Sequence, residues 1–178
     1  ARDWSESTGY PKYIDVDSFI DYYIVQELTK NIDGNLRKSS FITIENGGKM
    51  VMYHLWDFDL TLGNAGYFAA ETGNGYENFW IMNHRWYPYL FRDPAFVDRL
   101  QERWAELYPE LAKVPQFISE QALYIDKAKD RNFQVWSIHE SVDWVMFPSL
   151  GSYERELEYL KEFYTRRLGW LNVEINKL

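Results

Sequence analysis

The sequence contains no cysteine, which excludes disulfide bonds and thiolate metal sites. It also contains no apolar run approaching the roughly 20 residues that a membrane-spanning helix needs. Basic side chains are in the minority, because 19 Lys and Arg stand against 27 Asp and Glu and give a formal net charge of -8. This charge argues against nucleic acid or an anionic membrane as the main partner.

Several signatures of known site classes are also missing. The chain has no G-x-S-x-G, H-E-x-x-H or Walker sequence, and no signal-peptide pattern. Its three histidines lack ligand spacing, which favours hydrogen-bonded histidines over a zinc site. The first residues, ARDW, include no initiator Met, and we interpret residues 1–12 as a linker or the tail of an upstream domain.

Aromatic residues, in contrast, are abundant: 8 Trp, 14 Tyr and 11 Phe among 178 residues. This length is typical of one domain with a single sizeable core. An aromatic-rich core is the favoured interpretation, and rings exposed for ligand stacking are the alternative.

The first half of the chain predicts a helix followed by a β-hairpin. Apolar residues at helical spacing indicate a helix over 15–31, with Asp15 as its N-cap. Residues 40–44 and 49–56 are rich in β-branched and aromatic side chains, and Asn-Gly-Gly separates them. We therefore predict a hairpin with the three-residue loop 46–48.

One register of this hairpin matches charges, rings and apolar side chains. Its pairs are Glu45–Lys49, Ile44–Met50, Thr43–Val51, Ile42–Met52 and Phe41–Tyr53. Continued outward, this register puts Arg37 opposite Asp57.

The second half reads as one loop and four helices. Gly and Asn residues predict a loop over 63–78, where long loops are often functional. The predicted helices span 79–91, stopped or kinked by Pro88; 93–111, with Asp93 as N-cap; 114–136; and 152–178, with Ser152 as N-cap. We interpret Arg131, Arg166 and Arg167 as parts of solvated helix faces.

Three carboxylates flank the predicted hairpin, Asp33 before it and Asp57 and Asp59 after it. Because a hairpin folds back on itself, Asp33 and Asp57 are expected to face one pocket. Protein kinases have a related layout, in which one Asp orients the attacking hydroxyl and the Asp of a D-F-G triplet holds Mg²⁺. Each residue also has a structural alternative: a turn former at Asp33, a cap or Arg37 partner at Asp57, and an N-cap at Asp59.

The stretch from Tyr13 to Asn64 resembles the core of CotH-type proteins, the spore coat protein H kinase family. The resemblance rests on the helix-and-loop sequence DVDSFIDYYIVQELTKNIDGN, the hairpin, and WDFD followed by GN. A looser match continues through 130–136 and 160–175. The resemblance implies an α+β, mainly helical fold over 13–178, similar to the C-terminal lobe of a protein kinase with one β-hairpin.

The same resemblance implies an activity and a set of site residues. The reaction would be transfer of the ATP γ-phosphoryl group, with Mg or Mn, to a Ser or Thr of a surface or coat protein in an extracytoplasmic, bacterial setting. Asp33 matches the catalytic Asp, and Asp57 matches the metal-binding Asp, with Asp59 beside it. The possible auxiliary residues are Lys38, which would neutralise phosphate or pair with a carboxylate, Asn64, and Arg37. Asn64 has its own alternative as a left-handed turn residue.

The resemblance also has a gap, since no Gly-rich phosphate loop and no Lys-Glu pair precede Tyr13. We expect this chain to be the C-terminal lobe of a longer protein and to be nearly inactive alone. One alternative is a non-catalytic module that binds cell-surface glycans or proteins through exposed aromatic residues near 63–87, with structural or Ca²⁺-binding carboxylates. Another is a catalytically dead scaffold.

Overall fold

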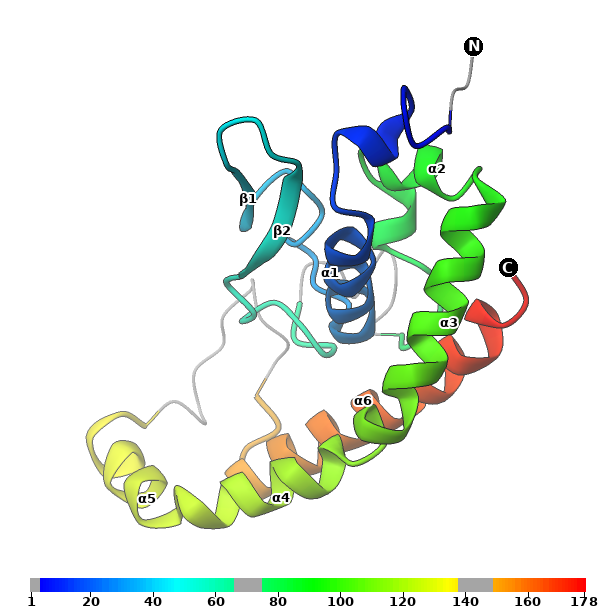
Figure 1. Cartoon of the computed structure of the whole chain (residues 1–178). Coiled ribbons are helices and arrows are strands. Elements are labelled where there is room, and N and C mark those ends of the chain that lie inside the picture. Colours follow the sequence, from blue (N-terminus) through cyan, green and yellow to red (C-terminus); the bar gives the residue numbers. More distant parts are fainter. Residues whose placement is uncertain (1–3, 66–74, 138–148) are drawn as a thin grey trace.

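The structure, a computed structural model, describes residues 4–65, 75–137 and 149–178. Over these residues the fold is mainly helical α+β with one antiparallel hairpin, as predicted (Figure 1). The elements are η1 (Tyr10–Lys12), α1 (Val16–Thr29), β1 (Ser40–Ile44), β2 (Met50–Leu55), η3 (Ile81–Asn83), α2 (Tyr87–Leu90), α3 (Pro94–Leu111), α4 (Val114–Tyr124), α5 (Asp126–Val135) and α6 (Tyr153–Ile175). No helix within these ranges is long and apolar enough to cross a membrane.

Helix α1 lies at the centre of the fold. The Asp15 carboxylate accepts a hydrogen bond from the Ser18 N–H, which confirms the predicted N-cap. The predicted apolar face is buried, and β2, α3 and α6 pack against the helix, which lies between the hairpin and α3 in Figure 1. The core therefore surrounds α1. Residues bonded to either end of α1 are consequently attached to a rigid element.

The predicted hairpin register is correct near the turn and wrong further out. Ile44 pairs with Met50 and Thr43 with Val51, as predicted, but Phe41 pairs with His54. Two residues of β2 therefore lie opposite Ile42 alone, which is a β-bulge.

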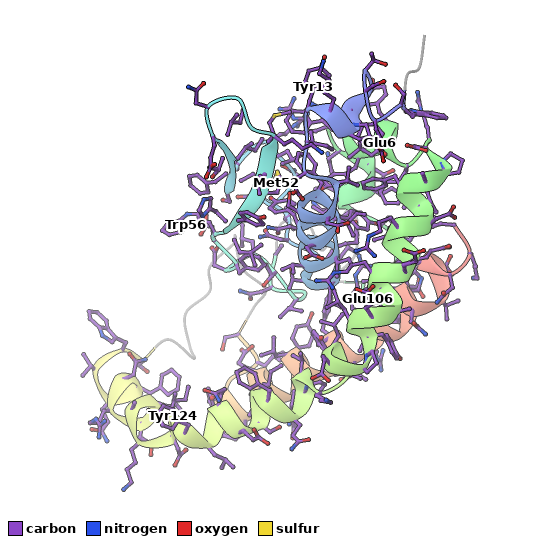
Figure 2. All side chains as sticks on the ribbon, in the orientation of Figure 1. Glu6, Tyr13, Met52, Trp56, Glu106 and Tyr124 are labelled. Atoms are coloured by element: carbon purple, nitrogen blue, oxygen red, sulfur yellow. The ribbon has the colours of Figure 1, made fainter. Side chains whose placement is uncertain are left out.

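The hairpin face that was predicted to be apolar is only partly covered. Met52 lies on the side of β2 that faces α1 (Figure 2) and is only 3% exposed. Ile44, near the turn, is 61% exposed. The predicted uniformly apolar face is therefore covered only where α1 reaches it. Beyond the bulge the register is shifted by one residue, so Arg37 no longer lies opposite Asp57.

Two predicted helices are broken. Pro88 does not stop a helix over 79–91; it lies in the first turn of the short α2, where its missing N–H needs no partner. The predicted helix over 114–136 divides into α4 and α5 at Ile125. Neither α4 nor α5 has a buried residue, so apolar packing does not force them to continue as one helix.

The remaining helix starts agree with the predictions. Asp93 accepts a hydrogen bond from the Ala95 N–H, and Ser152 accepts one from the Arg155 N–H. Before the first helix, the Tyr10 hydroxyl donates to the Asp93 carboxylate, so part of the segment predicted as a linker packs on the domain. Most of the predicted loop over 63–78 lies outside the described residues.

Candidate functional site

One buried side chain, Asn31, joins the two segments that carry the candidate carboxylates. Its Oδ1 accepts hydrogen bonds from the N–H groups of Asp33 at 3.1 Å and Gly34 at 3.2 Å. Its Nδ2 donates to the Asp57 carbonyl at 3.3 Å. The loop of Asp33 and the motif of Asp57 are therefore neighbours, held by a single amide with no exposed surface.

The same two segments also share backbone hydrogen bonds. The Leu62 N–H donates to the Thr29 carbonyl at 2.7 Å, and the Ile32 N–H donates to the Leu60 carbonyl at 3.4 Å. The last turn of α1 and the residues after it therefore position the whole motif that follows β2. Sequence analysis missed Asn31, because its spacing indicates only the end of a helix.

Asp57 has a left-handed backbone conformation and an exposed side chain. Its φ is +64°, which is uncommon outside glycine but is adopted by Asp more readily than by most residues. Its Oδ2 accepts a hydrogen bond from the Ser39 hydroxyl at 2.9 Å. In the described part of the chain Asp57 has no ion pair with Arg37, so that predicted pairing is wrong. The bulge in the hairpin is the cause.

Asp59 and Asn64 close the turn that follows Asp57. The Asn64 Nδ2 donates to the backbone carbonyl of Asp59 at 2.8 Å, which leaves the exposed Asp59 carboxylate outside this contact. In this turn the positive φ angles belong to Leu62 and Gly63. The alternative prediction of a left-handed turn residue therefore holds for these two positions and not for Asn64.

Lys38 lies beside the candidate catalytic carboxylate. Its Nζ is 3.8 Å from the Asp33 Oδ2, with side chains that are 71% and 21% exposed. A pair this open to solvent contributes little stability. Its relevance is positional, because an exposed cation stands next to Asp33.

The carboxylates of Asp57 and Asp59 suit a metal ion that is also bound by phosphate oxygens. Within the described ranges, no three His, Cys, Asp or Glu side chains gather into a metal site. Mg²⁺, however, is usually held by one or two carboxylates together with phosphate oxygens. The exposed carboxylates of Asp57 and Asp59, in a segment that Asn31 joins to the loop of Asp33, fit that arrangement and do not fit an all-protein cage.

Beneath the site lies a buried ionic cluster that sequence analysis also missed. The Arg167 Nη2 is 2.6 Å from the Glu27 Oε1, and the two side chains are 0% and 1% exposed. The prediction that Arg167 belongs to a solvated helix face is therefore wrong, whereas its neighbour Arg166 is exposed. Helical spacing alone did not show which of the adjacent arginines faces α1.

This cluster holds residues 75–82, the segment that leads into η3. The Glu27 carboxylate accepts the N–H groups of Trp80, Ile81 and Met82. Arg167 donates to two backbone carbonyls of the segment and Lys30 to two more; these belong to Tyr76 and Asn78, and to Gly75 and Glu77.

Burial sets the electrostatics of this cluster. Burial, together with the positive charge of Arg167, lowers the pKa of Lys30 to about 8. Burial raises the pKa of the Glu27 carboxyl, and Arg167 and the three N–H groups oppose that shift. With four favourable contacts to its charged form, Glu27 is best described as a carboxylate paired with Arg167.

Comparison with known proteins identifies a family. The family model described as CotH kinase protein matches residues 3–171, which is nearly the whole chain. No curated protein and no solved structure matches the chain.

Proposed function

The chain belongs to the CotH kinase protein family, and from this premise we propose that it supplies the catalytic carboxylates of a protein kinase. The reaction is transfer of the ATP γ-phosphoryl group to a Ser or Thr hydroxyl of a protein substrate. The observation that carries the proposal is the Asn31 amide, which joins the loop of Asp33 to the motif of Asp57.

Each carboxylate has a role in this proposal. Asp33 accepts a hydrogen bond from the substrate hydroxyl and orients its oxygen toward the γ-phosphorus. It takes the hydroxyl proton as the new oxygen–phosphorus bond forms and the bond from the γ-phosphorus to the bridging oxygen of ADP breaks, so that ADP leaves. Asp57 and Asp59 would hold Mg²⁺ or Mn²⁺, which would supply positive charge to neutralise the phosphate oxygens. Lys38, beside Asp33, adds a positive charge at the same edge of the site.

The proposal leaves part of the kinase to other residues. A protein kinase covers the phosphates with a Gly-rich loop and positions them with a Lys-Glu pair. We propose that these elements lie outside residues 1–178 and that this chain alone turns over little ATP. Family membership favours a coat or surface protein as the acceptor and an extracytoplasmic setting.

The test is phosphoryl transfer by the full-length protein with Mn²⁺ and labelled ATP. Asp33→Asn and Asp57→Asn are expected to lower the rate by about 100-fold or more, because each removes a group that acts in the transition state. Asp98→Asn is the matched control, since Asp98 is a carboxylate on α3, away from the candidate site. Asp33→Asn and Asp57→Asn variants as active as Asp98→Asn would refute the assignment.

A second candidate function, a non-catalytic binding module, has one observation in its favour. Phe41, Tyr53 and Trp56 are 50–70% exposed and line an open groove of about 530 Å³ on the hairpin. Trp56 points away from the body of the domain in Figure 2. All three rings lie outside the predicted region near 63–87, although Trp86 in that region is exposed too. Binding of a surface glycan or protein that persists without ATP and metal would favour this function.

A further inference from the structure

Trp80 contacts both halves of the candidate site from a third segment of the chain. Its indole Nε1 donates to the Ile32 carbonyl at 3.2 Å. The ring packs against a small buried cluster formed by Ile32, Leu60 and Ala65. Ile32 directly precedes Asp33, and Leu60 and Ala65 belong to the turn that follows Asp57. One ring therefore lies against the backbone that carries each candidate carboxylate.

The peptide unit before Asp33 is held at both ends. Its carbonyl, which belongs to Ile32, accepts from Trp80, and its N–H, which belongs to Asp33, donates to Asn31. A peptide plane with both polar groups bonded to fixed partners has little freedom to rotate. That plane contains the Asp33 Cα, so it fixes the point from which the Asp33 side chain leaves the backbone.

Trp80 is itself fixed by the buried ion pair. Its backbone N–H donates to the Glu27 Oε1 at 2.6 Å, and Glu27 is locked by Arg167. The neighbouring N–H groups of Ile81 and Met82 bond to the other oxygen of the same carboxylate, at 2.7 and 3.2 Å. The indole therefore projects from a backbone that is anchored to the middle of the core.

We propose that Trp80 is a positioning residue: its indole N–H and ring set the Asp33 loop against the Asp57 motif. Trp80 acts through Asp33 and touches no reacting atom. The inference rests on the proposed function, since it assigns a structural reason for the orientation of the proposed catalytic Asp. Glu27 and Arg167 contribute indirectly, because they hold the backbone of Trp80 in place.

The test compares Trp80→Phe with Trp170→Phe. The first variant keeps an aromatic ring and removes the donor to Ile32. The control changes a partly buried Trp that packs on Phe79 and beneath the Arg167 guanidinium, next to the same segment but away from Asp33. Melting temperatures of both variants measure any general loss of stability, and Trp80→Tyr replaces Trp80→Phe if the latter does not fold.

Two readouts separate positioning from stability. In the 178-residue chain, Trp80→Phe is expected to raise amide hydrogen exchange at Asp33 and Gly34 about tenfold more than the control, the effect of one lost hydrogen bond. In the full-length protein it is expected to lower kcat by about tenfold while the KM for ATP changes less than about twofold.

The outcomes distinguish this inference from the function on which it rests. A wild type without phosphoryl transfer would overturn the proposed function. If the wild type is active but Trp80→Phe and Trp170→Phe have the same hydrogen exchange at Asp33 or the same kcat, the role of Trp80 is overturned and the proposed function is not.

Discussion

Replacing Arg167 by Met is expected to lower the free energy of unfolding by about 3–5 kcal/mol, because it leaves the Glu27 carboxylate buried without its partner. Both side chains are essentially without solvent contact, so water cannot replace the lost interaction. The substitution also removes the donors to the Tyr76 and Asn78 carbonyls. Urea unfolding of the wild type and the variant measures the difference.

The adjacent residue offers a matched control. Arg166 is 56% exposed and pairs with Glu162 on the surface of α6. Arg166→Met is expected to change the free energy of unfolding by less than about 1 kcal/mol, as for most exposed ion pairs. Equal losses for the Arg166 and Arg167 variants would contradict the account of a buried pair that organises residues 75–82.

Replacing Gly63 by Ala is expected to cost about 3 kcal/mol of stability, because two penalties coincide. The φ of Gly63 is +84°, a region in which an L-residue costs roughly 1–2 kcal/mol. A Cβ there would also lie 2.7 Å from the Phe163 Cδ2, and closer still to the Tyr159 hydroxyl, so these two side chains of α6 would have to shift. Thermal or urea unfolding of Gly63→Ala gives the cost.

The hairpin provides the control for this substitution. Gly47 has a φ of +75°, but no atom lies within 4 Å of the place that an alanine methyl group would take, so Gly47→Ala carries the backbone penalty alone. The expected loss for that variant is about 1–2 kcal/mol. If Gly63→Ala and Gly47→Ala lower the free energy of unfolding equally, the close packing of Gly63 against α6 does not contribute to stability.

Local signals explain which parts of the fold the sequence predicted. Caps such as Asp15 and Asp93 depend on residues a few positions apart, and the apolar face of α1 follows from 3.6-residue periodicity. The hairpin turn was equally local, since Asn-Gly-Gly favours the required φ angles. The predicted hairpin alone implied that the segments of Asp33 and Asp57 lie side by side, and the Asn31 contacts agree with that prediction.

The missed features depend on contacts between segments distant in the sequence. The bulge opposite Ile42 leaves no residue signature in β1 or β2, and it moved Arg37 away from Asp57. The burial of Arg167 requires a carboxylate that lies 140 positions earlier in the chain. Asn31 and Trp80 have ordinary local roles, and only their partners in other segments link them to the site.

The central claim is that Asp33 and Asp57 belong to one metal-assisted site, and Mn²⁺ titration of the isotope-labelled chain tests it most directly. A bound paramagnetic ion broadens the NMR signals of nearby amides. The account predicts selective broadening at Asp33, Gly34 and residues 57–59, and loss of that broadening in Asp57→Asn. Broadening no stronger there than at exposed acids on α3, or unchanged in Asp57→Asn, would contradict it.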